Sequence, residues 1–237
     1  MIIEAGLTRY EAVNEEIEKQ LKKQNKVTVK DVNGQRYIGC ALDEGKTVEV
    51  YGTPGNDMAC YLNGGRVVVY GNCQDAVGNT MGGGEIVVHG HSGDAMGYGM
   101  RDGQIYIRDN VACRGGIHMK EFRQMRPVLV IGKNAGSFLG EYMAGGTIVL
   151  TPSFYLPGVW AGMHGGKIFV RGSFPKENIS DNIKIQNLDE TDKKELDMYI
   201  KKYCKFFNAD YNTIMAKPFK KLVPASSRPY ANLYTPN

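Results

Sequence analysis

Histidines are the residues of this 237-residue chain whose type and spacing come closest to metal chemistry. His89 and His91 are separated by one residue, Asp94 follows, and His118 and His164 stand further along. Alternate residues of a strand share one face, so the first pair could supply two imidazole ligands. A zinc site needs at least one further protein ligand, and none stands at a recognisable spacing. The sequence therefore predicts no metal site and places these histidines at the surface.

Cysteines are the second group with reactive side chains: Cys40, Cys60, Cys73, Cys113 and Cys204. Zinc and iron–sulfur sites are typically marked by C-x-x-C pairs, and the sequence contains none. Their odd number is also atypical of a disulfide framework, so buried free thiols are the simpler prediction. A G-x-S-x-G serine motif is absent as well. The residues therefore predict no catalytic site and no cofactor site in this chain.

Two glycine-rich segments raise the question of a phosphate site. The segment "GCALDEGKT" (residues 39–47) is close to a P-loop, but it has one residue too many between its glycines and leads into a strand rather than a helix. The segment "GYGMRDG" (residues 97–103) contains G-x-G and belongs to a repeat that explains its glycines. Neither segment is predicted to bind phosphate.

The repeat is a short strand motif that recurs about every 20 residues, as in solenoid proteins. Its copies are VEVYG from Val48, VVVYG from Val67, IVVHG from Ile86, IYIRD from Ile105, VLVIG from Val128, IVLTP from Ile148 and IFVRG from Ile168. Such a unit is too short for a βαβ crossover, which needs about 30 residues. One strand and two glycine bends suit a coil whose like residues stack about 4.8 Å apart. The sequence predicts an all-β chain, a right-handed parallel β-helix of about seven coils.

Two columns of the repeat are predicted to build a corner of each coil. The first is an apolar ladder in the core: Leu62, Met81, Met100, Met119, Met143 and Met163. The second precedes the ladder by three residues in four of the coils: Gly78, Gly97, Gly116 and Gly140. Corners that require a positive φ, or that leave no space for a Cβ, favour glycine. This requirement accounts for many of the chain's 30 glycines.

The strands also predict an apolar stripe on the outside of the coil. Alternation places Val48 and Val50 in the core and turns the residue between them outward. In the later coils this outward residue is Val68, Val87, Tyr106, Leu129, Val149 and Phe169. A stripe of this kind requires a cover, which either the chain's own helices or a partner protein could provide.

The two ends of the chain differ from its middle. Residues 1–25 predict a helical cap, with an amphipathic helix from Thr8 to Gln24 that opens with a capping box of Thr8 and Glu11. Residues 26–175 are the glycine-rich β-helix. Residues 176–237 predict a second capping helix over residues 189–207 and an extended tail rich in proline, aromatic and basic residues.

Charge and hydropathy exclude several kinds of partner. The formal net charge is only +4, and the basic residues are not interleaved with aromatic ones along one segment, so nucleic-acid binding is not predicted. No run of about 18 apolar residues marks a membrane span. The N-terminal segment carries acidic residues where a signal peptide carries basic ones, which predicts a cytoplasmic protein.

The glycine-rich coil, the corner "RGGIHMKE" (residues 114–121) and "RPYANLY" (residues 228–234) together resemble a known family. They are similar to the C-terminal GXGXG β-helix domain of the glutamate synthase large subunit, here as a free-standing chain. The resemblance implies a β-helix that holds catalytic domains together and has no catalytic residue of its own. In that family FMN, the 3Fe-4S cluster and the glutaminase cysteine belong to other domains. Met1 is followed here by an isoleucine rather than by that cysteine.

The resemblance also implies partners. They are the FMN-containing synthase subunit and the glutaminase subunit of a split glutamate synthase, which makes glutamate from glutamine and 2-oxoglutarate. The surface expected to face them is the outward stripe together with Arg228 and Tyr230 of the tail. Whether the chain self-associates stays open at this point.

Two other functions remain open from the sequence. The third subunit of formylmethanofuran dehydrogenase has a similar coil, so the chain could serve that enzyme or an N-methylglutamate synthase-like complex. A different class would be an independent β-helix enzyme, or a ligand-binding protein with a groove along one sheet.

Overall fold

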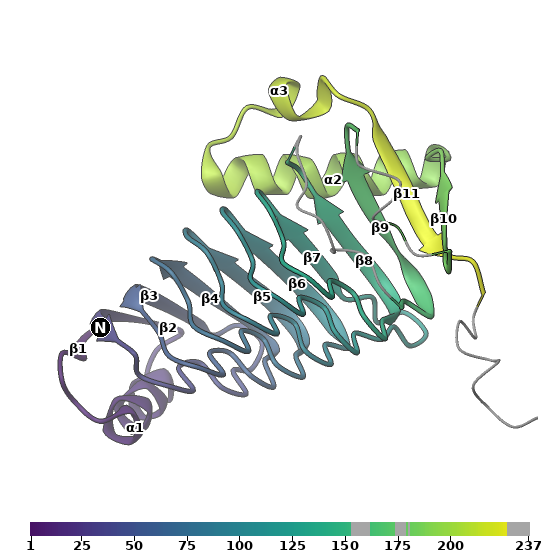
Figure 1. Ribbon diagram of the computed structural model, residues 1–237. Helices are drawn as coiled ribbons and strands as arrows, with labels where there is room; N and C mark the ends of the chain where they lie inside the picture. Colours follow the sequence, from purple (N-terminus) through teal and green to yellow (C-terminus); the bar gives the residue numbers. More distant parts are fainter. Residues whose placement is uncertain (153–161, 174–178, 180, 227–237) are drawn as a thin grey trace, which may run out of the picture.

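One continuous sheet organises the molecule. The computed structural model describes residues 1–152, 162–173, 179 and 181–226. Figure 1 shows coils stacked along one axis, with α1 (Tyr10–Leu21) at one end and α2 (Glu190–Phe207) lying along the sheet near the other. The coils form a solenoid of about 7 turns, which confirms the predicted β-helix.

The sheet has 11 strands in the order β1-β2-β3-β4-β5-β6-β7-β8-β9-β11-β10. The first nine pair in parallel, and β11 pairs antiparallel with both β9 and β10. Their bounds are β1 (Ile2–Glu4), β2 (Lys26–Asn33), β3 (Thr47–Thr53), β4 (Asn63–Tyr70), β5 (Gly82–Val88), β6 (Asp102–Ile107), β7 (Val128–Ile131), β8 (Ala144–Leu150), β9 (Gly165–Arg171), β10 (Ile183–Gln186) and β11 (Phe219–Pro224).

Like residues stack from coil to coil, with one exception to the predicted register. Ile105 of β6 pairs with Leu129, and Tyr106 pairs with Val130. Leu129 therefore lies in the inner core, and the outward position predicted for Leu129 belongs to Val130. The prediction was wrong because all four residues of β7 are apolar and buried, so alternation carries no signal for which of them faces inward.

The apolar ladder runs through the core. Its first five members have no exposed surface and Met163 is 1% exposed: Leu62, Met81, Met100, Met119, Met143 and Met163. Five of the six ladder residues stand one or two positions before the next strand, and Met119 is separated from β7 by the longer segment of its coil. The ladder packs against the inward side chains of the strands in a single cluster. Flexible methionine side chains suit such a column, since they fill irregular gaps between stacked coils.

The corner before each ladder residue has an unusual backbone. In the coil of Met81, Ala76, Gly78 and Thr80 all have positive φ, at 60°, 65° and 53°. The N–H groups of Ala76 and Thr80 donate to carbonyls of the following coil, over 2.8 and 2.7 Å, whereas that of Gly78 donates to the preceding coil over 2.9 Å. Alternate left-handed residues thus point successive donors to opposite sides, which links each coil to both of its neighbours.

Glycine holds the middle of these three positions in the coil of Met81, whereas Ala59 holds it, with φ of 55°, in the coil of Leu62. The other coils repeat the pattern, with φ between 65° and 68° at Gly97, Gly116 and Gly140. A Cβ on Gly78 would lie 2.6 Å from Cδ1 of Ile105. The flanking positive-φ positions accept larger side chains, among them Thr80 and His118, with φ of 53° and 56°.

The N-terminal end is closed by α1 and β1. Val13, Ile17 and Leu21 of α1 are buried against the first coils. The predicted capping box of Thr8 and Glu11 is wrong, because α1 begins at Tyr10 and the Glu11 carboxylate instead binds the Arg9 guanidinium, over 2.9 Å. β1 extends the sheet by a strand that the sequence did not predict.

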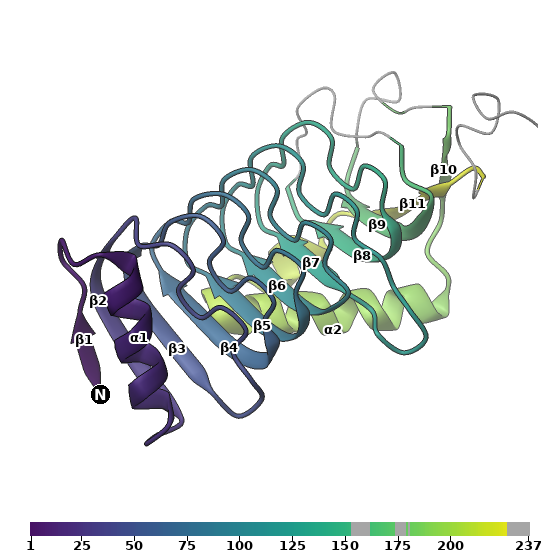
Figure 2. The ribbon, with the colours of Figure 1, turned by 90° about the horizontal axis from the view of Figure 1, so that it is seen from below.

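The C-terminal segment folds back over the solenoid. Asp189 caps α2 through a reciprocal capping box with Asp192, and α3 (Tyr211–Met215) leads into β11. Seen from below in Figure 2, α2 crosses several coils rather than closing the end, and the antiparallel strands continue the sheet beyond β9. Across the described residues, no helix combines the length and apolar character needed to cross a membrane.

Candidate interaction surface

The helix α2 covers most of the predicted outer stripe. Tyr106, Val149 and Phe169 have no exposed surface. They form a second core cluster with α2 residues and with Val130, which takes the place of Leu129. The α2 residues buried in this cluster are Leu196, Tyr199, Ile200 and Tyr203.

Val68 and Val87, at the start of the stripe, are also buried, with 3% and 1% of their surface exposed. In the neighbouring positions Glu85 forms ion pairs with Arg66 (2.7 Å) and with Lys202 of α2 (2.6 Å). The stripe is therefore closed by the chain itself, and its assignment as a partner-facing surface was wrong. Arg228 and Tyr230, the other two predicted contacts, lie outside the described residues.

A network of buried charges fixes the start of α2. Lys167 of β9 binds Asp192 over 2.9 Å and Glu195 over 2.6 Å, and Lys221 of β11 also binds Asp192. Burial alone would raise the pKa of Asp192, but hydrogen bonds from Lys221 and Lys167 outweigh it and bring that pKa to about 2. These four residues line a cavity of about 570 Å³, and Glu121 lines it with them.

This network contains the residue types of an active site, but its lysine is not in the protonation state that catalysis requires. A lysine can act as nucleophile or base only when its pKa is lowered, usually by burial. Burial lowers the pKa of Lys167, yet the hydrogen bonds that it donates to Glu195 and Asp192 reverse the effect, and the pKa is raised overall. The network therefore attaches α2 and β11 to the coil as a set of ion pairs.

The thiols and histidines do not form an activated site in the part of the chain described here. Burial raises the pKa of Cys73 and of Cys204, so neither is held as a thiolate. His89 stacks on Tyr70, with ring centroids 4.8 Å apart, and burial with the charge of Arg108 lowers its pKa. Among the described residues, no three His, Cys, Asp or Glu side chains are placed to hold a metal ion.

Exposed aromatic residues gather on the corner side of the solenoid. Tyr98, His118 and Tyr142 form a continuous row: Tyr98 meets His118 edge to face at 5.7 Å, and His118 stacks on Tyr142 at 5.1 Å. Tyr98 and Tyr142 are 41% and 42% exposed, and Phe138, beneath the Arg114 guanidinium, is 43% exposed. We name Tyr98, His118, Phe138 and Tyr142 the corner aromatic surface.

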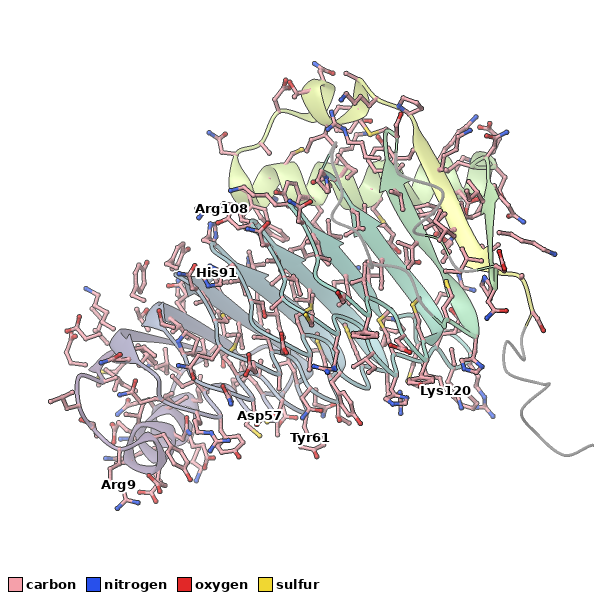
Figure 3. All side chains as sticks on the ribbon, viewed as in Figure 1. Arg9, Asp57, Tyr61, His91, Arg108 and Lys120 are labelled. Carbon is pink, nitrogen blue, oxygen red and sulfur yellow. The ribbon has the colours of Figure 1, made fainter. Side chains whose placement is uncertain are left out.

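The corner aromatic surface faces away from α2. His118 and Tyr142 each precede a ladder residue, as Tyr61 does in an earlier coil. Figure 3 labels Tyr61 on the edge of the solenoid opposite α2. Sequence reasoning missed this surface because its members fall in three different columns of the repeat, although His118 lies in the corner "RGGIHMKE" that contributes to the family resemblance.

The irregular coil also carries an exposed hairpin. Phe122 and Met125 exchange two backbone hydrogen bonds of 3.1 and 3.0 Å, and their side chains are 53% and 38% exposed. The Arg123 guanidinium lies 5.0 Å from the centroid of the Phe122 ring. The longer interval between β6 and β7 was the sequence signal for this hairpin, since regular coils have no room for it.

Comparisons of the sequence with known proteins give matches over nearly all or all of the chain. The sequence matches the family described as "GXGXG motif" over residues 8–227. It is 39% identical over 253 residues to the uncharacterized protein MJ1350 of Methanocaldococcus jannaschii, and this alignment covers 100% of the present chain and 97% of that protein.

Proposed function

Because the chain belongs to the GXGXG motif family, which includes the C-terminal domain of the glutamate synthase large subunit, we propose that it is the scaffold subunit of a split glutamate synthase. One observation carries the proposal: the family match spans residues 8–227, so nearly all of this chain is the β-helix domain. The glutaminase reaction and the reduction that forms glutamate would then take place on partner subunits, which would carry FMN and the 3Fe-4S cluster. The complex would serve glutamate biosynthesis and hence nitrogen metabolism.

The ion pairing and protonation of the polar residues support a non-catalytic role. The buried carboxylate of Asp192 and the largely buried ammonium of Lys167 are engaged in ion pairs that attach α2. Burial raises the pKa of the Cys73 and Cys204 thiols. The raised pKa values of Lys167, Cys73 and Cys204 keep these three groups protonated, which is not the state that a nucleophile requires.

The architecture supports a scaffold. Each coil is bonded to its neighbours through the strand ladder and through the alternating corner donors, so the coils form a stiff rod. A stiff rod can hold two partners at a fixed separation, which a reaction that passes an intermediate between sites requires.

The proposal assigns the contact with the FMN-containing subunit to the corner aromatic surface. Interfaces are enriched in Tyr, Phe and Arg relative to the remaining surface. Tyr98, Phe138 and Tyr142 are exposed there, and Arg114 and Arg101 lie beside them. The contact assigned to the outer stripe by the sequence is replaced by this one.

Co-purification tests the proposal. The chain is co-expressed with the glutaminase and FMN-containing subunits, and we expect it to retain both at micromolar concentration. Tyr142→Ala combined with His118→Ala should weaken retention at least tenfold. The matched control is Tyr51→Ala in β3, which removes another exposed aromatic side chain that stacks on a neighbour, Tyr70 of β4.

Each outcome bears on a different part of the proposal. Failure of the wild-type chain to retain either of the two catalytic partners would overturn the scaffold role. Equal retention by the double variant and the wild type would exclude the corner aromatic surface. A chain ending at Ser226, which keeps β11 whole, tests Arg228 and Tyr230 separately, since loss of binding in that variant would place the contact in the tail.

A further inference from the structure

Two cysteines of neighbouring coils face each other near the N-terminal end of the solenoid. The Sγ atoms of Cys40 and Cys60 are 3.3 Å apart. Beside them, the N–H of Ala41 donates to the carbonyl of Cys60 over 2.8 Å, which joins the two backbones. The cysteines hold equivalent places in their coils, since each precedes a buried leucine by two residues, Leu42 and Leu62.

Stacked positions of this kind suit a disulfide. Neighbouring strands lie about 4.8 Å apart, and disulfides typically span Cα separations of about 4.4–6.8 Å. The two sulfur atoms are already in contact, so a disulfide bond of about 2.05 Å requires them to approach by little more than 1 Å.

The two thiols differ in their access to solvent. Cys40 is exposed and lines a cavity of about 400 Å³ beside α1, together with Leu21 and Tyr37. Cys60 is buried, with 3% of its surface exposed. A reagent from solution can therefore reach Cys40 first, and Cys60 is the group that can react with Cys40 next.

We propose that Cys40 and Cys60 form a reversible disulfide by exchange with a low-molecular-weight disulfide such as oxidised glutathione. The Cys40 thiolate attacks one sulfur of the reagent, forms a mixed disulfide and releases one glutathione thiolate. Cys60 then loses its proton to solvent and attacks the Sγ of Cys40, which releases the second glutathione. The two protein thiols are oxidised by two electrons, and one glutathione disulfide is reduced to two thiols.

The burial of Cys60 affects the rate of the second step. Burial and the neighbouring thiol of Cys40 raise the pKa of Cys60 to about 12, so little of it is thiolate at neutral pH. Exchange depends on the thiolate, so the mixed disulfide on Cys40 should accumulate before the internal bond closes. A reducing cytosol would reopen the bond, and oxidation would tie the first two coils together.

Mass spectrometry of the intact full-length chain tests the proposal. Incubation with oxidised glutathione should give first an adduct of about 305 Da and then a species about 2 Da lighter than the reduced chain, as two-step exchange requires. Peptide mapping should join the peptides of Cys40 and Cys60, and dithiothreitol should reverse the change. An adduct on Cys40 that never closes, or a bond to another cysteine, would overturn the proposal.

Variants separate the role of Cys40, which reacts first with glutathione disulfide, from that of Cys60, which closes the internal bond. Cys60→Ser should stop at the adduct, whereas Cys40→Ser should give neither adduct nor internal bond at these positions. Cys113→Ser, which removes a half-buried thiol from the corner of a later coil, should behave as the wild type. The oxidised wild type should melt roughly 5 °C above the reduced form, because the bond closes a loop in the unfolded chain. Equal melting of the two forms in Cys40→Ser is the expected control.

Discussion

The hydroxyl of Tyr203 in α2 donates a hydrogen bond of 3.0 Å to the backbone carbonyl of Arg108, at the end of the strand β6. The contact joins residues far apart in the chain and lies where α2 crosses the coils. Tyr203 is 5% exposed, so the bond is shielded from water. It marks the position at which the C-terminal helix is attached to the edge of the sheet.

The absence of a side chain at Gly132 makes space for this hydrogen bond. A double-mutant cycle should detect the coupling between Gly132 and the Tyr203 hydroxyl. A Cβ on Gly132 would overlap the Tyr203 hydroxyl and the Arg108 carbonyl. We expect Tyr203→Phe to cost about 1 kcal/mol of unfolding free energy. Gly132→Ala should cost roughly 3 kcal/mol in the wild type and less in Tyr203→Phe, measured by urea denaturation. Additive costs would show that the hydroxyl does not occupy this space; Tyr98→Phe, at the exposed corner, is the neutral control.

The corner glycines separate backbone strain from steric overlap. Gly45 and Gly78 both have positive φ, at 76° and 65°, but a Cβ on Gly45 would meet nothing within 4 Å. Gly45→Ala should therefore cost about 1 kcal/mol, the strain of a left-handed alanine. Gly78→Ala adds overlap with Ile105 and should cost roughly 3 kcal/mol. Similar costs for the two variants, from thermal or urea unfolding, would contradict the crowding at Gly78.

The ladder predicts a large effect of a buried charge. Met100 lies in the middle of the ladder without exposed surface, so Met100→Asp places a carboxylate in the core. We expect a loss of about 4 kcal/mol or more, visible as a lowered melting temperature. Met198→Asp on α2, where the native side chain is 50% exposed, is the matched control and should change stability by less than about 1 kcal/mol. A melting temperature of Met100→Asp within two degrees of the wild type would be incompatible with the ladder.

Asp192 predicts a dependence of stability on acid pH. Its pKa is about 2 in the folded chain and 3.8 in the absence of the fold, so the unfolded state binds the proton more readily. The carboxylate therefore stabilises the fold above about pH 4, and this contribution of roughly 2 kcal/mol is lost as the pH falls from 4 to 2. Asp192→Asn should flatten the stability curve in this interval, measured by urea denaturation at each pH. Glu18→Gln, on the exposed face of α1, should keep the wild-type slope.

The repeat of about 20 residues in the sequence was sufficient to predict the β-helix fold. Recurring Val and Ile strands, the methionine ladder and the corner glycines each repeat with the coil, and stacking of like residues is what a solenoid requires. The corner backbone could be predicted only in part. Glycine indicates a positive φ at Gly78, but Ala76 and Thr80 also adopt positive φ, and their residue types do not indicate it. Their conformation is imposed by hydrogen bonds to the following coil, which exist only after stacking.

The interaction surface was harder to predict for a related reason. An apolar stripe in the sequence shows that a cover exists, but not which segment supplies it. Here Leu196 and Ile200 of α2 cover Tyr106 and Phe169. The register of β7 was also ambiguous, since Leu129 and Val130 are both apolar and both buried. Only pairing with β6 distinguishes the inner face of β7 from the outer one.

The antiparallel strand β11 has a consequence for assembly. A parallel solenoid leaves unpaired backbone groups at each end, and a second copy could add there coil upon coil into a filament. At this end, β11 enters the sheet in the opposite direction and β10 closes it, with Lys184 and Gln186 exposed beside Ile185. An incoming parallel coil would meet a reversed strand instead of a matching coil. The reversal thus ends the parallel stacking of coils at β9.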